Sequence, residues 1–306
     1  CVPPLQFENA IARVSALNCD NIRVVEMTND DSWIRDCGPT FLINDKGERR
    51  AVDWEFNAWG GLVDGLYFPW DQDALVARKV CELTNTDSYK TEDFVLEGGS
   101  IHVDGEGTVM VTEMCLLHPS RNPHLSKEEI EQKLKDYLNC EKVIWVKDGI
   151  DPYETNGHID DVACFVKPGE VACIYTEDEN HPFYKEAKDA FEFLSEQTDA
   201  KGRKLKVHKM CVTKKPCYLK DADTIDFSEG AIPREEGEVA IASYLNFLIV
   251  NGGIILPQYG DENDALAVEQ VQAMFPDRKV VGVETTEIAY GGGNIHCITQ
   301  QQPATK

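Results

Sequence analysis

The chain has 306 residues, of which 42% are hydrophobic and 9% aromatic, enough apolar material to bury the core of a globular protein. Acidic residues outnumber basic ones by 54 to 30, so the formal net charge is −24 and the pI is near 4.6. This balance argues against nucleic acid or an anionic membrane surface as the main partner, because both require a basic face. It is compatible with a small cationic ligand, although most of these charges are expected to be solvated surface.

No apolar run reaches the length of about 18 residues that spans a bilayer. The longest candidate, 245–256, is interrupted by Asn246 and by the turn at 251–253, which predicts two strands instead. The chain begins at Cys1 without a signal peptide, and we expect an N-terminal segment to be missing. Eleven scattered cysteines without a C-x-x-C pair or a zinc-type cluster are typical of reduced thiols in a cytoplasmic protein.

Taken in chain order, the sequence predicts four similar units, each consisting of a strand, a tight turn and a second strand. The expected strand pairs are 40–43 with 50–54, 101–103 with 108–112, 162–166 with 171–175, and 243–250 with 254–256. A shortened fifth copy is expected at 291–299, as a last strand. Apolar periodicity predicts helices after most of these units, at 71–83, 126–138, 182–196 and 262–275, the second with a capping box of Ser126 and Glu129.

No linker or low-complexity tract divides the sequence, which predicts a single domain over residues 1–306. A hairpin unit that recurs with helices between the copies is typical of a radial α/β array, not of a wound parallel sheet. Such an array directs the beginning of each unit towards a common axis. The residues that would meet there are Asp36, Glu97, His158, Asp160 and Cys297.

Each of these residues has a structural as well as a chemical interpretation. His158 and Asp160 are two apart in a segment with strand character, so alternation would put both on one face for proton transfer or cation binding, or for a structural hydrogen bond. Glu97 precedes two glycines, which would let a ligand approach the backbone, but it would also suit a surface turn. Asp36 follows Arg35, with which it would form a surface ion pair.

Cys297 follows three successive glycines, 291–293. Such a segment loses backbone entropy on folding and makes sense where a ligand must come close or where N–H groups face a developing charge. A thiol at this place is a candidate nucleophile, or one more buried cysteine. We expect Cys37, Cys164 and Cys173 to be core thiols.

Several carboxylates, one histidine and one cysteine on a common rim suit covalent attack on a planar cation. The carboxylates would hold a guanidinium by charge-assisted hydrogen bonds, the thiol would attack its carbon, and the imidazole would protonate the departing ammonia. A Cys-His-Asp hydrolase that acts on amides is the competing arrangement. It requires no second and third carboxylate, so the acidic rim favours a guanidine.

The strings NDDSWIRDCGPTF, AVDWEFNAWGG, LEGGSIHVDGEGT, TNGHIDD and GGGNIHCITQQQP resemble the agmatine deiminase family of the guanidine-modifying, or pentein, superfamily over nearly the whole chain. The resemblance implies a five-bladed, pseudo-symmetric α/β propeller, with a first blade that would be incomplete here. It further implies hydrolysis of agmatine to N-carbamoylputrescine and ammonia in putrescine and polyamine biosynthesis, with no metal or cofactor. A cytoplasmic homo-oligomer is expected from the same resemblance.

The motifs also imply a role for each candidate. Cys297 would be the nucleophile that forms a covalent thiouronium, and His158 the general acid and then the general base. Asp36 and Asp160 would hold the guanidinium nitrogens, and Glu97 would keep His158 charged. The remaining positions concern substrate binding: Trp33 and Gly293 at the pocket wall, and Glu154, four residues before the histidine, facing the primary amine.

One position near the site departs from the family pattern: Asp161 stands where an asparagine is usual, which we expect to add a negative charge beside the site. Two alternatives remain open at this point. The chain could be a deiminase of another guanidine, such as free or peptidyl arginine, or a catalytically incomplete fragment that only binds a polyamine. A metal-dependent ureohydrolase is disfavoured because no Asp and His string has binuclear spacing.

Overall fold

A computed structural model of the chain describes residues 1–222 and 229–305. Within these ranges the strands form four three-stranded sheets, each with its strands in sequence order. In every sheet the first two strands form an antiparallel hairpin and the third pairs parallel with the second. The strands are β1 (Thr40–Ile43), β2 (Arg49–Glu55), β3 (Ser88–Val95), β4 (His102–Val103), β5 (Thr108–Thr112), β6 (Lys142–Val146), β7 (Ala163–Lys167), β8 (Glu170–Tyr175), β9 (Lys206–Cys211), β10 (Leu248–Val250), β11 (Gly253–Gln258) and β12 (Lys279–Glu284).

Helices connect the second and third strands of each sheet, because a parallel pair needs a crossover long enough to return to the same edge. These helices are α4 (Val76–Leu83), preceded by the 3₁₀ turn η2 (Asp73–Leu75), then α6 (Lys127–Leu138), α7 (Tyr184–Glu196) and α8 (Asp264–Met274). All four predicted helices are therefore confirmed, and each starts one to five residues later than predicted. The shorter elements are η1 (Pro4–Gln6), α1 (Phe7–Ala16), α2 (Ile34–Cys37), α3 (Gly61–Asp64), η3 (Gly98–Ser100), α5 (Glu113–Leu116), η4 (Ile159–Asp161) and α9 (Thr286–Ala289).

The start of α6 shows how the sequence sets a helix boundary. The Ser126 hydroxyl accepts a hydrogen bond from the Glu129 N–H (3.2 Å), and the Glu129 carboxylate accepts one from the Ser126 N–H (2.8 Å). This reciprocal pair satisfies two donors that the first turn of a helix leaves free. The helix ends at Asn139, whose left-handed conformation (φ 53°) stops further helical hydrogen bonding.

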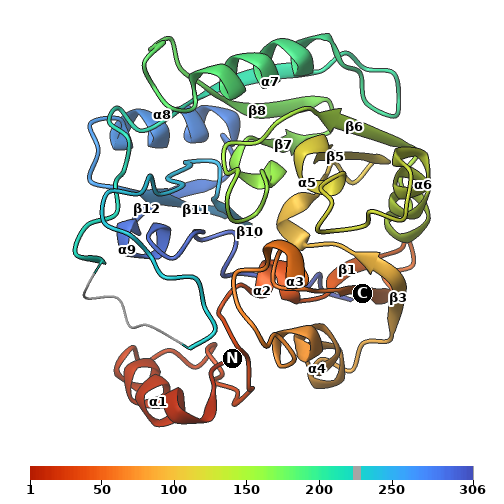
Figure 1. Ribbon diagram of the computed structural model, residues 1–306, viewed down its shortest axis with the longest axis vertical. Coiled ribbons are helices and arrows are strands. Elements are labelled where there is room, and N and C mark those ends of the chain that lie inside the picture. Colours follow the sequence, from red (N-terminus) through yellow and green to blue (C-terminus); the bar gives the residue numbers. More distant parts are fainter. Residues whose placement is uncertain (223–228, 306) are drawn as a thin grey trace.

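The four sheets surround a common centre, and α4, α6, α7 and α8 lie on the outside (Figure 1). One core combines apolar side chains of the first and second sheets with α6, and a second, continuous core joins the third and fourth sheets with part of the second. The loops that link one sheet to the next run towards the centre (Figure 1). The expected radial arrangement of α/β units is therefore observed, with mixed sheets as its repeating element.

Three segments that the sequence predicts as extended are turns at the centre of the molecule, although residues 248–250 of the predicted strand 243–250 do form β10. Residues 243–247 form a turn before β10, residues 291–299 form turns, and residues 159–161 form the 3₁₀ turn η4. The reason is that polar side chains in these segments bond to neighbouring loops. For example, the Asn246 amide oxygen accepts the N–H of His296 (3.0 Å), which replaces a ladder partner. Gly292 has a φ of +98°, which extended strands do not adopt.

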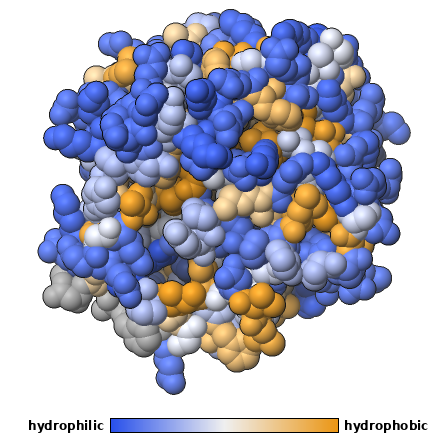
Figure 2. Space-filling model, turned by 45° about the horizontal axis from the view of Figure 1, so that its top comes forward, coloured by the Kyte–Doolittle hydropathy of each residue, from blue (hydrophilic) through white to orange (hydrophobic). Residues whose placement is uncertain are grey.

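The surface agrees with the acidic composition. Figure 2 shows a largely hydrophilic face on which apolar side chains gather in separate patches. Cys37, Cys164 and Cys173 are buried, as the sequence predicts for core thiols. Among the residues described, no helix combines the length and the apolar character that a membrane crossing requires.

Candidate active site

The loops at the centre of the molecule bring five predicted residues together. Asp36 lies in α2 before β1, Glu97 lies between β3 and β4, and Cys297 follows β12. His158 and Asp160 lie between β6 and β7, at and within η4. All five side chains are buried, with exposures of 1–6%. The surface interpretations of Asp36 and Glu97 are therefore wrong.

Gly99 is the point at which three of these side chains meet. A Cβ atom at this position would lie 2.6 Å from His158 Nδ1, 2.9 Å from Asp36 Oδ1 and 3.1 Å from Asp160 Oδ2. No side chain fits at those distances, so only glycine lets the three polar groups converge. His158 and Asp160 thus reach the same place, although a 3₁₀ turn and not strand alternation brings them there.

Asp36 is fixed by two neutral donors. Its Oδ2 accepts a hydrogen bond from the Trp59 indole N–H (2.9 Å), and its Oδ1 accepts one from the Gly99 N–H (2.8 Å). The His158 Nδ1 lies 3.8 Å from Oδ2. The predicted ion pair with Arg35 is not formed, because the buried Arg35 side chain donates to the His296 carbonyl instead (3.2 Å). Asp36 therefore presents its carboxylate to the centre and not to the solvent.

Glu97 is paired with a cation that the sequence analysis did not identify. The Arg121 Nε donates to Glu97 Oε1 at 2.6 Å, and both side chains are 1% exposed. Burial alone raises the pKa of Glu97, but Arg121 and, after it, His158 outweigh burial and lower that pKa below its usual value. The other oxygen of Glu97 lies 3.7 Å from His158 Nε2.

The electrostatic surroundings of His158 favour its charged form. Burial lowers the pKa of an imidazole, but the Asp36 carboxylate, Cys115 and Glu97 more than offset this and raise the pKa of His158 well above its usual value. His158 is therefore an imidazolium near neutral pH. A charged imidazole can donate a proton to a leaving group.

Asp160 has one engaged and one free oxygen. Its Oδ2 lies 2.7 Å from Nδ1 of His296, a contact that holds the pKa of Asp160 below its usual value against the effect of burial. Its Oδ1 is buried and has no hydrogen-bond partner among the described residues. A buried carboxylate oxygen without a partner is costly unless a donor arrives, and a guanidinium N–H is such a donor.

The surroundings of Asp161 oppose the extra negative charge that the sequence predicts there. Burial, followed by the charges of Asp160 and Asp151, raises the pKa of Asp161 well above its usual value. Its Oδ1 accepts a hydrogen bond from the Asn246 amide (3.0 Å). A second buried carboxylate beside Asp160 is strongly disfavoured, which favours the protonated form of Asp161.

Cys297 is held by Asn246 on one side and by a glycine segment on the other. The Asn246 amide nitrogen lies 3.1 Å from the Cys297 Sγ, which itself lies 3.7 Å from Asp160 Oδ2. A Cβ at Gly293 would come within 3.0 Å of the Cys297 Cβ and 2.5 Å of the Trp33 ring, so Trp33 covers this segment. Burial, then the charge of Asp160, raises the pKa of the Cys297 thiol well above its usual value. These surroundings favour the protonated thiol.

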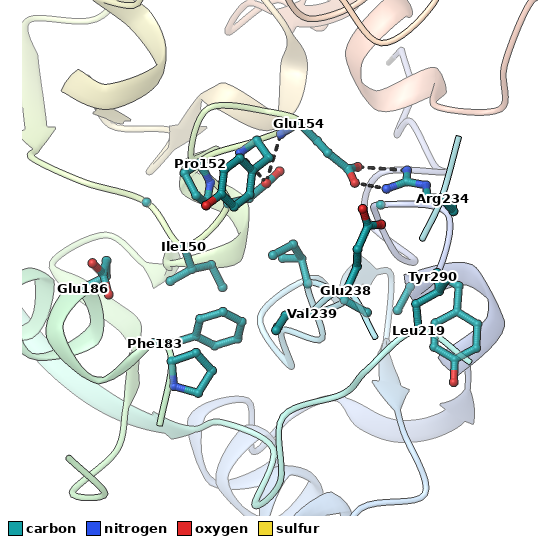
Figure 3. A pocket seen from close by; sticks show the side chains of 18 of the residues that line it. Ile150, Pro152, Glu154, Phe183, Glu186, Leu219, Arg234, Glu238, Val239 and Tyr290 are labelled. Atoms are coloured by element: carbon teal, nitrogen blue, oxygen red, sulfur yellow. Dashed lines mark hydrogen bonds and ion pairs between the residues drawn. The ribbon is translucent and has the colours of Figure 1, made fainter. Parts of the chain in front are cut away.

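A cavity of about 880 Å³ lies next to this centre. Glu154 and Gly292 line it, together with apolar side chains such as Ile150 and Phe183 (Figure 3). A Cβ at Gly292 would lie 1.9 Å from Glu154 Oε2, so Glu154 packs directly on the glycine segment that leads to Cys297. Glu154, the predicted amine-binding carboxylate, therefore lines the cavity and contacts the glycine segment that precedes Cys297.

One group of side chains has the spacing of a metal site. The ligand atoms of Glu97, Cys115 and His158 lie within 4.8 Å of one another. A metal needs a neutral imidazole and a thiolate, whereas His158 is held protonated here. Glu97 is already neutralised by Arg121. The residues present therefore fit a proton-transfer site better than a metal ion.

Sequence reasoning missed Arg121 and Asn246. A buried arginine in a loop has no sequence signal of its own, because arginines are mostly exposed. Asn246 did have one: it precedes β10 in the fourth unit, where Asp36, Glu97 and Asp160 precede the earlier hairpins. Its place in the repeat could have identified it.

The chain matches the model of the Porphyromonas-type peptidyl-arginine deiminase family over residues 1–303. A Streptococcus mutans protein is 84% identical over 100% of this chain and 83% of its own length. The agmatine deiminase of Pseudomonas aeruginosa is 54% identical over 100% of this chain and 83% of its own length. The solved structure of the agmatine deiminase of Enterococcus faecalis superposes with a TM-score of 0.96 at 66% identity, covering 99% of this chain and 82% of that one. The chain therefore belongs to the Porphyromonas-type peptidyl-arginine deiminase family and, within it, groups with the agmatine deiminases.

Proposed function

We propose that the chain is a hydrolase that deiminates agmatine to N-carbamoylputrescine and ammonia, a step that leads to putrescine and other polyamines. One observation carries the proposal: Asp36, Asp160 and His158 converge on Gly99, and the Cys297 thiol lies 3.7 Å from Asp160. The convergence of these groups suits a planar cation with several N–H donors. The relatives favour agmatine over another guanidine as substrate, because the similar proteins of Pseudomonas aeruginosa and Enterococcus faecalis are named agmatine deiminases.

The reaction follows from the protonation states. The guanidinium binds between Asp36 and Asp160, and its positive charge lowers the pKa of the nearby Cys297 thiol, which releases its proton to the solvent. The thiolate attacks the guanidinium carbon, and His158 donates a proton to the nitrogen that leaves as ammonia. The resulting thiouronium is attacked by water, whose proton returns to His158, and collapse releases Cys297 and the ureido product.

Further residues position the substrate. Trp33 and Gly293 form the wall beside Cys297, and Glu154 attracts the primary ammonium while repelling a second carboxylate. Glu97 keeps His158 charged. This set uses side chains alone and requires no metal or cofactor.

The same proposal extends to the architecture. The four sheets occupy four positions around the centre, and residues 1–27 lie at the remaining position (Figure 1), which supports a five-bladed pentein propeller in a single domain over 1–306. We also propose that the protein is a cytoplasmic homo-oligomer. The location and the oligomeric state follow from the resemblance to the family.

Ammonia release from agmatine tests the function, with arginine as the second substrate and Cys297→Ala as the comparison. We expect release from agmatine alone and its loss in the variant by at least about 10³-fold. Activity that survives the substitution, or release from arginine only, would contradict the proposal. Binding of agmatine without any ammonia would favour the incomplete-fragment alternative.

A further inference from the structure

Arg234 forms an ion pair with Glu154, the carboxylate to which the substrate's primary ammonium is proposed to bind. Its guanidinium forms a bidentate ion pair with Glu154, with Nη1 facing Oε1 and Nη2 3.0 Å from Oε2. Nη2 also donates to the Gly291 carbonyl at 2.8 Å. Figure 3 shows the two side chains facing one another at the edge of the cavity. Both oxygens of Glu154 are thus engaged by a cation of the protein itself.

The segment that carries Arg234 is bounded by two glycines. Gly230 and Gly237 have φ values of +90° and +86°, a conformation that glycine adopts without strain. Between them, the Ile232 N–H bonds to the Leu66 carbonyl (2.9 Å), and the Gly237 N–H bonds to the Leu219 carbonyl (3.0 Å). Arg234 therefore extends from a loop that is anchored at both ends.

The ion pair lies against the backbone that leads to the nucleophile. A Cβ at Gly292 would meet Glu154 and Arg234, whereas a Cβ at the next residue, Gly293, would meet Trp33 and Cys297. The three contacts of Arg234 thus connect the cavity wall to the glycine segment beside Cys297. Glu154 thus packs on Gly292, and the adjacent residue, Gly293, packs on Cys297.

We propose, resting on the function proposed above, that Arg234 is a specificity-determining residue that occupies Glu154 in the free protein and is displaced by the substrate's primary ammonium. A bidentate pair leaves the carboxylate electrically neutral, so the ammonium gains its full attraction only when Arg234 moves away. Glu238 lies beside the pair (Figure 3) and offers the displaced guanidinium a second carboxylate. A guanidine without a second cation cannot make this exchange.

The exchange has a measurable consequence. An internal competitor lowers apparent affinity by the fraction of molecules in which Glu154 is free. Removing the competitor must therefore strengthen binding of agmatine, and only while Glu154 is present. If Arg234 instead held Glu154 in position for the ammonium, its removal would weaken binding.

The test is to measure KM and kcat for agmatine with wild type, Arg234→Gln and a matched control, Arg203→Gln. The control removes the ion pair of Arg203 with Asp199, and neither of these residues lines the cavity. We expect Arg234→Gln to lower KM by about 3- to 10-fold with kcat within about twofold, and Arg203→Gln to change neither. In a Glu154→Gln background, the Arg234→Gln effect should disappear. Arg234→Lys, which keeps the charge but not the fork, should give an intermediate KM and serves if the glutamine variant does not fold.

An unchanged or raised KM in Arg234→Gln, or an equal effect with and without Glu154, would overturn the inference. These results are separable from failure of the proposed function. If wild type releases no ammonia from agmatine, the function itself fails. If wild type is active and Arg234→Gln binds no more tightly, only the role of Arg234 fails.

Discussion

Arg121 sets the charge at the centre of the site through a single buried contact. Its guanidinium donates to Glu97, to the Asn156 amide oxygen (2.8 Å) and to the Thr155 carbonyl (3.2 Å), so it is held on several sides. Glu97 stays ionised because of this pair and in turn supports the charge of His158. Arg121 acts on His158 only through Glu97 and does not face the substrate, so we regard it as a positioning residue.

Substitution of Arg121 should change the pH dependence of the reaction. In the proposed mechanism His158 acts as an acid, so activity should be present below its raised pKa and be lost as pH rises through that pKa. Arg121→Gln removes the charge that lowers the pKa of Glu97, so Glu97 becomes easier to protonate. A protonated Glu97 no longer stabilises the charged imidazole, and the pKa of His158 falls. The alkaline limb of kcat/KM for agmatine should therefore move about 1 pH unit downwards, whereas Arg121→Lys should retain most of the wild-type profile.

The alkaline limb distinguishes this role from a structural one. Loss of one partner from a buried ion pair destabilises a protein by about 3–5 kcal/mol, so the unfolding of both variants must be measured as well. A folded Arg121→Gln protein with lower activity but an unshifted limb would contradict the positioning role.

At the level of the element, the links between sheets deliver the chemistry. Glu97 lies between the first and second sheets, Asp160 between the second and third, Asn246 between the third and fourth, and Cys297 after the fourth. The helices of the crossovers lie outside and contribute none of these groups (Figure 1). A change in a crossover helix should therefore affect stability and leave the reaction unchanged.

The capping box of α6 offers a test of this separation. Ser126→Ala removes the acceptor for the Glu129 N–H and should lower the free energy of unfolding by about 1 kcal/mol. The pKa of Glu129 is lowered by its hydrogen bonds with the Ser126 backbone and side chain, so its contribution is present above its usual pKa and fades as pH falls. Urea denaturation should show a lower midpoint with an unchanged m-value, and kcat/KM should stay the same.

A double substitution controls for effects unrelated to the cap. Because Ser126 and Glu129 form one reciprocal pair, the loss in Ser126→Ala/Glu129→Ala should be smaller than the sum of the two single losses. Strictly additive losses, or a fall in kcat/KM, would show that the pair does not act as a cap separate from the site.

For the whole molecule, the net charge of −24 is the dominant feature. The surface carries ion pairs, such as Arg50 with Asp87, whose side chains are largely exposed and add little. Repulsion among the remaining carboxylates therefore disfavours the compact state. The same field attracts a dicationic substrate towards the cavity, so the acidic balance suits the proposed ligand while it weakens the fold.

Salt should consequently stabilise the protein. Raising NaCl from a low concentration to about 0.5 M shortens the screening length well below its value of about 10 Å at 0.1 M. If screening contributes about 1 kcal/mol, the melting temperature of a chain of this length should rise by about 1–2 °C, measured by differential scanning calorimetry at pH 7. Sucrose at equal osmolality separates screening from osmotic effects, and a melting temperature that falls or stays constant in salt would contradict the argument.

Local sequence determined the four hairpins, their crossover helices and the candidate site residues. Turn glycines, apolar periodicity and the capping box act within a few residues, so the two strands of each hairpin and the helix α6 are readable from neighbours alone. The third strand of each sheet, β3, β6, β9 and β12, was missed, because each pairs with its sheet only across a long crossover. The motifs also identified Asp36, Glu97, His158, Asp160 and Cys297 as a set before any coordinates placed them together.

Tertiary structure decided the backbone at the centre, the partners of the charges and their protonation. The segments 243–247 and 291–299 are turns because their polar groups bond to loops far along the chain, which periodicity cannot register. Arg121 finds Glu97 across 24 residues, and Arg234 finds Glu154 across 80. The pKa of Asp161 is raised and that of Asp160 is lowered although the two residues are adjacent, because burial and the nearest partner, not residue type, set the pKa of a carboxyl group.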